Sequence, residues 1–290
     1  MNGILLIDKP SGWTSNDVVQ KLRGILRERR IGHAGTLDPM ATGLLTVFVG
    51  RATRAVAFAE GMNKRYLAGF RPGVTTDTQD ITGNFLRKEE VQLTEKEMHA
   101  VCAAFTGEIQ QIPPMYSAVK VNGQRLYRLA RRGEEVERTA RKIVIENLEP
   151  VGRDGEDWIL DVTCSKGTYV RTLCHDMGEK LGCGACMSSL RRMAAGRFSV
   201  EDAYTLTDVQ QAADNERAEE LLLPIDSLFQ AYPALTVTGA AEKKIRNGQG
   251  FLSDKADPGP VRLYSQNGEF LALGNAENGS VSIIKSFFEV

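Results

Sequence analysis

Residues 32–45, with the sequence GHAGTLDPMATGLL, combine a stiff loop with a single carboxylate. The three glycines allow backbone angles that other residues resist. Pro39 fixes its own φ angle and pushes Asp38 toward an extended conformation. The apolar run at residues 44–49 then indicates a buried strand. A loop constrained in this way would aim the Asp38 carboxylate in one direction, as nucleophilic catalysis requires.

The same residues allow a structural interpretation of Asp38. Aspartate is a favoured N-cap and proline is favoured at the first helical position, so Asp38 could cap a helix that begins at Pro39. For the loop taken alone, the helix cap is the preferred interpretation, and further motifs are needed to favour the nucleophile.

Five segments, in order, resemble the TruB family of tRNA pseudouridine synthases. They are residues 6–15 (LIDKPSGWTS), 32–45, 64–66 (KRY), 164–172 (CSKGTYVRT) and 190–192 (LRR). One short motif is weak evidence, whereas five in the family's order over most of the first two hundred residues are specific. The resemblance implies that the protein isomerises uridine to pseudouridine in the TΨC loop of tRNA, at position 55.

The resemblance also implies which residues carry the reaction. The family's nucleophilic aspartate falls at Asp38, and its cationic partner falls at Arg171. Burial alone would raise the pKa of Asp38, so a cation is needed to keep the carboxylate charged, and an arginine fork fits a carboxylate. Arg171 could equally form an ordinary structural ion pair. The reaction uses no metal, nucleotide or redox partner, so we expect no cofactor.

A stacked uridine must be flipped out of the RNA before it can react. The resemblance assigns four substrate-binding residues to this step: Tyr66 stacks on the base, Tyr169 lines the pocket, Leu190 contacts the uracil through its backbone, and His33 fills the space that the flipped nucleotides leave. Each has a plainer interpretation. The tyrosines and the leucine could be core residues, and the histidine could be a general base or a structural residue.

Charge is distributed unevenly along the chain, although the formal net charge is only −1. Residues 21–30 and 120–142 are rich in lysine and arginine, whereas residues 201–226 carry eight acids and one base. This asymmetry predicts a basic working face and an acidic back, although arginines often merely coat exposed helices. The interleaved Tyr116 and Tyr127 favour RNA as the partner of the second basic run. Its candidate RNA-backbone residues are Arg125, Arg128, Arg131, Arg132, Arg141 and Lys142.

The elements expected around these residues alternate between strands and helices. Apolar spacing and capping residues predict helices near residues 18–26, started by Ser15 or Asn16, and at 94–105, 170–181 and 207–220. Strands are predicted at residues 66–70, 142–151 and 158–164. By resemblance, the fold class is α+β, with a mixed, mainly antiparallel sheet in a catalytic domain at residues 1–230 and an RNA-clamping arm at about 113–142. Short strands after residue 231 predict a small β-rich domain at residues 231–290, which resembles a PUA-type RNA-binding domain.

Bulk properties fit an ordinary globular chain of 290 residues with 42% hydrophobic and 25% charged residues. No apolar run approaches the roughly 20 residues that cross a bilayer, and the N-terminus does not resemble a signal peptide, so we expect a cytoplasmic location and no membrane partner. Five cysteines, an odd number, argue against a disulfide framework, and the pair Cys183 and Cys186 lacks the two further ligands of a zinc site. We therefore expect no structural metal.

Two alternatives fit parts of the pattern. Guide-RNA-dependent relatives, typified by dyskerin, share the aspartate motif but work with protein partners. The compact length and residues 66–86 favour the stand-alone type, for which the resemblance implies the tRNA T-arm stem-loop as partner, no obligatory protein partner and a monomer. A non-catalytic protein that helps tRNA fold would be expected to lack residues such as Asp38, Tyr66 or Arg171, and all three are present.

Overall fold

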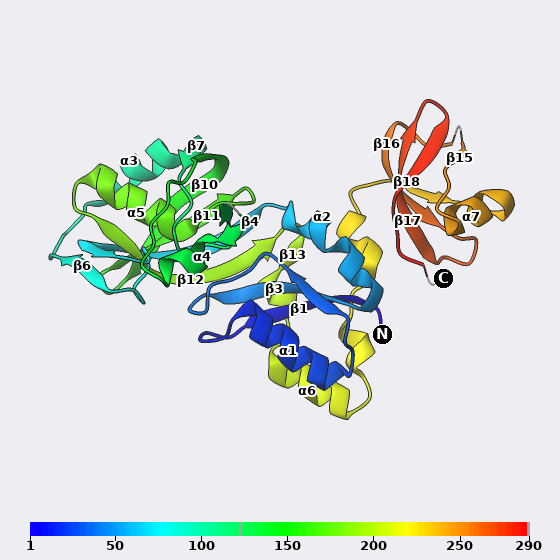
Figure 1. Cartoon of the computed structure of the whole chain (residues 1–290), viewed down its shortest axis with the longest axis horizontal. Coiled ribbons are helices and arrows are strands. Elements are labelled where there is room, and N and C mark those ends of the chain that lie inside the picture. The colour runs from blue at the N-terminus through cyan, green and yellow to red at the C-terminus, as the bar shows by residue number, and fades with distance from the viewer. Residues whose placement is uncertain (122, 254, 289–290) are drawn as a thin grey trace.

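A nine-stranded sheet runs through most of the molecule, and a separate five-stranded sheet forms one end (Figure 1). This computed structural model describes residues 1–121, 123–253 and 255–288. No helix within those ranges is long and apolar enough to span a bilayer.

The large sheet is mixed, with mainly antiparallel pairing. Its strand order is β1 (Gly3–Lys9), β3 (Thr42–Val49), β12 (Ala185–Ala195), β4 (Lys64–Pro72), β11 (Asp157–Cys164), β10 (Arg141–Asp154) and β7 (Gly107–Gln111), with β2 (Ile31–Ala34) paired to β3 and β13 (Phe198–Ser199) paired to β12. Only the contact between β3 and β12 is parallel among these pairings. The predicted α+β class with a mainly antiparallel sheet is therefore confirmed.

Helices pack on this sheet through apolar stripes. α3 (Glu95–Phe105) and α5 (Val170–Leu181) share one core cluster with β4, β10 and β11, while α1 (Ser15–Leu26) and α6 (Leu206–Asp214) share another with β1 and β3. Thr94 and Glu97 form the predicted capping box of α3, and Gly182 ends α5 in the left-handed conformation. α6 is shorter than predicted because the chain turns at Glu216, whose φ is 58°, before a short 3-10 helix at Ala218–Leu221.

The start of α1 differs from the prediction. Its N-cap is Thr14, which forms a capping box with Asp17, rather than Ser15 or Asn16. The hydroxyl of Ser15 instead accepts a hydrogen bond of 2.9 Å from the backbone N–H of Leu37. Ser15 thus supports the loop that carries Asp38, and the neighbouring threonine caps the helix.

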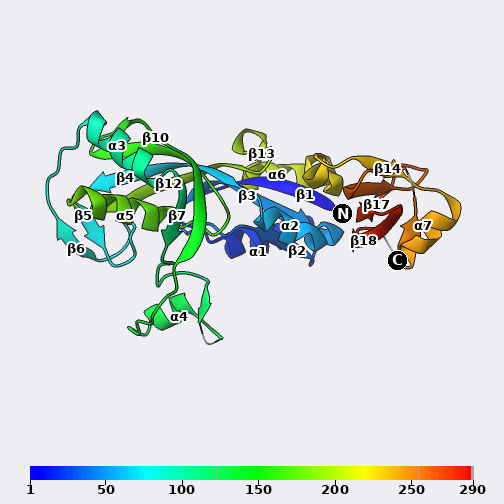
Figure 2. The same cartoon turned by 90° about the horizontal axis from the view of Figure 1, so that it is seen from above.

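The remaining elements of the first 230 residues are short. α2 (Val56–Glu60) follows a 3-10 helix at Gly50–Ala55, β5 (Val74–Thr76) pairs with β6 (Phe85–Lys88), and further 3-10 helices lie at Val200–Asp202 and Ile225–Phe229. Between β7 and β10 the chain leaves the sheet as an arm, residues 112–140, which contains β8 (Lys120–Val121), β9 (Gln124–Arg125) and α4 (Leu126–Ala130). Figure 2 shows this arm projecting from the side of the sheet on which α1 and α2 lie.

The C-terminal sheet has the order β14 (Ala234–Thr236), β16 (Gly259–Tyr264), β17 (Phe270–Glu277), β18 (Ser280–Ser286) and β15 (Phe251–Leu252), with α7 (Gly239–Arg246) packed against it. The predicted β-rich C-terminal region is present. It contacts the rest of the chain through aromatic rings, because Phe229 lies 6.1 Å from Phe270 and 5.8 Å from Phe287 between ring centroids.

Gly43 marks the place where β3 meets β12. Its φ is 94°, and a Cβ at this position would collide with the backbone of its cross-strand partner Arg192. Gly155, in the turn between β10 and β11, also has a positive φ of 59°, but a Cβ there would meet nothing within 4 Å. Substitution at Gly155 therefore measures the cost of the left-handed conformation alone, whereas substitution at Gly43 adds the cost of a steric collision.

We expect Gly155→Ala to lower the free energy of unfolding by about 1–2 kcal/mol, the cost of a left-handed backbone for a residue with a Cβ. Gly43→Ala should lower it by a further ~1–3 kcal/mol, because the collision forces β3 and β12 apart. Urea unfolding followed by circular dichroism measures both values. If both variants lost the same free energy of unfolding, the close approach of Gly43 to Arg192 would add nothing to the cost of substitution.

Candidate active site

Asp38 lies in the loop that connects β2 to β3. No helix follows it. The backbone N–H of Ala41 donates a 3.1 Å hydrogen bond to the Asp38 carbonyl, and the chain then enters β3 at Thr42. The interpretation of Asp38 as a helix cap is therefore wrong, and its carboxylate is left to interact with groups outside the loop.

Residues from the N-terminal motif hold this loop in place. The ammonium of Lys9, whose side chain is fully buried, donates to the carbonyls of Pro10, Trp13 and Pro39 at 2.9, 2.6 and 3.2 Å. Burial lowers the pKa of Lys9 to about 8. No role for Lys9 beyond its place in a motif was predicted, because its partners are backbone carbonyls, which no side-chain pattern reveals.

Arg171 lies in the first turn of α5, and its guanidinium contacts the Asp38 carboxylate. Its Nη1 lies 3.2 Å from Oδ2 of Asp38 and 3.6 Å from Oδ2 of Asp80, and its Nη2 donates a 2.7 Å hydrogen bond to the carbonyl of Tyr116. Burial raises the pKa of Asp38, and Arg171 is the strongest group that opposes this shift. The side chain of Asp38 remains 34% exposed, whereas that of Arg171 is 8% exposed, so the carboxylate is the accessible member of the pair.

Asp80 is a buried acid that the sequence did not single out. It lies in the connection between β5 and β6, where its Oδ1 accepts hydrogen bonds from the hydroxyl of Thr78 and from the backbone and hydroxyl of Thr82. Its other oxygen faces Arg171. The turn-rich composition of residues 75–83 predicted a loop, and only the fold places that loop beside α5.

Tyr169 is the residue that precedes α5, and its backbone is extended. Its N–H donates to Oε1 of Gln111 at 2.8 Å, and Nε2 of Gln111 donates to its carbonyl at 3.1 Å. The ring centroid of Tyr169 lies 6.0 Å from the guanidinium carbon of Arg171. The fold therefore brings Tyr169 beside the pair of Asp38 and Arg171, and a buried glutamine at the base of the arm fixes it there.

Tyr66 and Leu190 lie on the neighbouring strands β4 and β12. The side chain of Leu190 belongs to the main apolar cluster. Tyr66 is 8% exposed, and its hydroxyl oxygen accepts a hydrogen bond of 3.3 Å from Nε of Arg192. Burial raises the pKa of Tyr66.

His33 lies in strand β2, paired with Val47, and not in a loop as its glycine neighbours suggested. Burial lowers its pKa, with the charge of Arg192 as the second cause, so the imidazole is neutral near pH 7. Its Nδ1 is buried and has no hydrogen-bond partner within the described ranges. Nor does His33 make a hydrogen bond or ion pair with Asp38 or Arg171 there, so it stands apart from the charged cluster.

The six candidate RNA-backbone residues are exposed and lie on the arm or at its return to the sheet. Arg125, Arg128, Arg131 and Arg132 belong to the arm, whereas Arg141 and Lys142 begin β10. Two of them pair with nearby acids: Arg132 with Glu134 at 2.8 Å and Lys142 with Glu108 at 2.6 Å. Exposed pairs of this kind contribute little and exchange readily, so these cations remain available to an anion.

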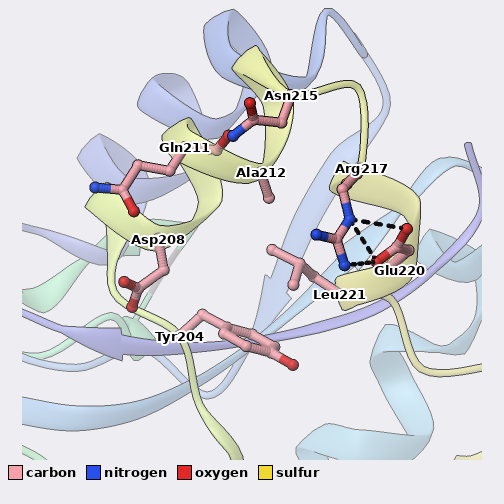
Figure 3. A pocket seen from close by; sticks show the side chains of 8 residues that line it. All are labelled: Tyr204, Asp208, Gln211, Ala212, Asn215, Arg217, Glu220 and Leu221. Carbon is pink, nitrogen blue, oxygen red and sulfur yellow. Dashed lines mark hydrogen bonds and ion pairs between the residues drawn. The ribbon is translucent and has the colours of Figure 1, made fainter.

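A pocket on the acidic part of the chain, residues 201–226, contains none of these residues. Figure 3 shows its lining of Tyr204, Asp208, Gln211, Ala212, Asn215, Arg217, Glu220 and Leu221. Arg217, the only base of the acidic segment, is held by Glu220 at 2.6 Å. The lining holds two acids and one base, so its net charge does not favour a phosphate.

Comparison with known proteins links this arrangement to one family. The model of the TruB family pseudouridylate synthase N-terminal domain matches residues 23–170, and that of the tRNA pseudouridylate synthase B C-terminal domain matches residues 171–230. The tRNA pseudouridine synthase B of Clostridium kluyveri is 41% identical over 99% of this chain and 100% of its own length. That of Syntrophomonas wolfei is 43% identical over 96% of this chain and 94% of its own.

Solved structures share the fold. A chain of the Cbf5–Nop10–Gar1 complex superposes with a TM-score of 0.76 at 27% identity, covering 99% of this chain and 85% of its own. A chain of the archaeal box H/ACA sRNP Nop10–Cbf5 complex gives a TM-score of 0.73 at 26% identity, with coverage of 99% and 86%.

Arg171→Met removes the strongest group that opposes protonation of Asp38 and leaves Asp80, a like charge, in place. We expect the pKa of Asp38 to rise further above its usual range. Carbon-13 NMR of labelled aspartate carboxyl groups, with the signal assigned through Asp38→Asn, measures the change. An exposed acid such as Asp214 serves as the internal control. An unchanged or lower pKa for Asp38 would contradict the electrostatic role given to Arg171.

Proposed function

This chain belongs to the TruB family of pseudouridine synthases, and we propose that it converts the uridine at position 55 of tRNA, in the TΨC loop, into pseudouridine. The activity of a tRNA pseudouridine synthase follows from relatives that match nearly the whole chain. The observation that carries the proposal for the site is the ion pair between Asp38 and Arg171, which lies beside Tyr169 and leaves Asp38 partly exposed.

The proposed reaction breaks the bond between N1 of uracil and C1′ of the ribose, turns the base and joins its C5 to C1′. N1 gains a proton and C5 loses one, so the product is an isomer and no redox step is needed. Asp38 is the proposed nucleophile, with attack on the base ring or on the sugar carbon both open. Arg171 supports this role because its charge opposes the rise in pKa that burial causes.

The target base is proposed to lie against Tyr66 after it has left the RNA stack. Stacking on an aromatic ring contributes roughly 1–3 kcal/mol per base, which offsets part of the cost of extrusion. Tyr169 is proposed to line the same pocket and Leu190 to contact the uracil edge through its backbone. The neutral state of His33 supports a role in filling space beside the flipped nucleotides rather than in attracting phosphate.

Phosphates of the tRNA T arm are proposed to bind the cations of the arm, including Arg131 and Arg132. The arm and α1, which is followed by three arginines at residues 27–30, lie on the same side of the sheet (Figure 2), which supports one continuous RNA-binding side. The C-terminal sheet is proposed to be a PUA-like RNA-binding domain that begins near residue 231.

We propose further that the chain acts in the cytoplasm as a monomer without an obligatory protein partner. The solved relatives come from complexes of Cbf5 with other proteins, and the alternative is that this chain also needs a protein partner. An assay that contains only the purified chain and an unmodified tRNA transcript separates the two.

The first test is tritium release from uridine labelled at C5 in that transcript. Wild type should release tritium from the T-loop uridine alone, and Asp38→Asn should release none because the amide cannot act as the nucleophile. Asp214→Asn, an exposed substitution of the same kind on α6, should leave release unchanged. Tight binding without release by the wild type would point to a folding helper or to a partner-dependent enzyme.

The arm is tested by the salt dependence of tRNA binding. Replacing Arg131 and Arg132 with alanine should weaken binding and flatten the plot of log K against log salt by about 1–2 units of slope, since each lost phosphate contact removes somewhat less than one unit. The control removes two exposed bases elsewhere, Lys180 and Arg217, and so matches the change in net charge. Equal slopes for the two double variants would contradict the arm as an RNA contact.

A further inference from the structure

Arg192 is a buried cation to which the proposed reaction assigns no role. It lies in β12, its side chain is 2% exposed, and it forms no ion pair with an acidic side chain in the part of the chain that the structure describes. A buried charge without a carboxylate is costly unless neutral groups bind it. A buried guanidinium in the sheet therefore needs neutral hydrogen-bond acceptors around it.

Those acceptors flank Asp38 on both sides. Nη1 of Arg192 donates to the carbonyl of Gly35 at 2.9 Å and to that of Leu44 at 3.1 Å, and Nη2 donates to the carbonyl of Thr36 at 3.3 Å. Gly35 and Thr36 precede Asp38 and Leu44 follows it, so one guanidinium joins the two ends of the loop that carries the carboxylate.

The fourth partner is Tyr66, which lies directly opposite Arg192 across β4 and β12, so that both side chains point to the same face of the sheet. Nε of Arg192 lies 3.3 Å from the Tyr66 hydroxyl, and its guanidinium carbon lies 5.5 Å from the ring centroid. An arginine has no acceptor, so the tyrosine oxygen must accept this hydrogen bond. The hydroxyl proton of Tyr66 is thereby turned away from Arg192.

We propose that Arg192 is a positioning residue that holds the Asp38 loop and Tyr66 in one fixed arrangement and adds an uncompensated positive charge to the pocket. The proposal rests on the proposed function, since its readout is the isomerisation. Four of the five N–H groups of Arg192 have partners among the loop carbonyls and Tyr66. Lysine would keep the charge but cannot reproduce this planar fork.

The charge of Arg192 acts on Asp38 together with three other groups. Arg171 of α5 and Lys9 of β1 also oppose the rise in its pKa, while Asp80 from the loop between β5 and β6 adds to it. Removing the charge of Arg192 therefore raises the pKa of Asp38. The acidic limb of the pH–rate profile then moves to higher pH, because Asp38 must be ionised to act as the nucleophile.

The experiment measures single-turnover rates on tRNA for Arg192→Lys and Arg192→Gln, with Arg191→Lys and Arg191→Gln as matched controls. Arg191 is the neighbouring arginine of β12, is 40% exposed and pairs with Asp8 at 2.8 Å. We expect Arg192→Lys to lower the rate by about 100-fold, the effect of misplacing reacting groups by about 1 Å. Its tRNA affinity should stay within about 3-fold of wild type, because a buried arginine contacts no phosphate.

Two readouts separate positioning from a purely structural role. Arg192→Gln should move the acidic limb to higher pH, whereas Arg192→Lys should leave it in place. In a double-mutant cycle with Tyr66→Phe, the combined loss for Arg192→Lys should be smaller than the product of the single losses, because both changes break the same hydrogen bond. Rates of Arg192→Lys within about 3-fold of the Arg191 controls, or fully multiplicative losses, would overturn the proposal.

Thermal unfolding shows whether each variant folds. If only Arg192→Gln fails to fold, the rate of Arg192→Lys and its double-mutant cycle with Tyr66→Phe still support or overturn the proposal. If Arg192→Lys also fails to fold, Arg192 is required by the fold as a whole and the specific positioning role is overturned. An inactive wild type would instead remove the proposed function, and the two failures are therefore distinguishable.

Discussion

Burial of a carboxylate raises its pKa, and the centre of this molecule is arranged around the cation that opposes that rise. Arg171 approaches Asp38 from the first turn of α5, and the same nitrogen, Nη1, also faces Asp80. One guanidinium thus serves two acids, of which only Asp38 is substantially exposed. The loop before α5 and the loop between β5 and β6 must both be placed accurately for this geometry, which explains why Gln111 fixes Tyr169 and three donors fix Asp80.

Two buried cations, Lys9 and Arg192, bind backbone carbonyls around Asp38. Lys9 of β1 donates to the carbonyl of Pro39, and Arg192 of β12 donates to those of Gly35, Thr36 and Leu44. The loop around Asp38 is therefore held by hydrogen bonds from two different strands. Each buried cation costs desolvation, and carbonyl dipoles compensate it only in this one loop conformation. A site built in this way is preorganised before substrate arrives, which is how an enzyme avoids reorganisation during the reaction.

The charged cluster around Asp38 and the exposed cations proposed to bind RNA belong to different parts of the chain. The charged cluster lies at the sheet, and the exposed arginines lie on the arm that leaves it between β7 and β10 (Figure 2). A hydrogen bond from Arg171 to the carbonyl of Tyr116, at the base of the arm, joins the two parts. The acidic helix α6 packs against α1, and the pocket beside it contains none of the residues of the charged cluster or of the arm.

Features that depend on neighbouring residues could be predicted before the fold was known. The capping box at Thr94, the stop at Gly182, the main strands and the constrained loop at Asp38 all follow from signals a few residues apart. The same local logic offered Asp38 as a helix cap and Ser15 as the cap of α1, and both interpretations failed where a distant partner competed. The contacts of Asp80 with Arg171 and of Arg192 with Tyr66 arise only in the folded chain, and the second joins residues 126 positions apart. The contact of Arg192 with Tyr66 depends on strand register, because a shift of one residue in either strand would turn one of these side chains to the other face of the sheet. The contact of Asp80 with Arg171 depends on how α5 packs beside the loop between β5 and β6.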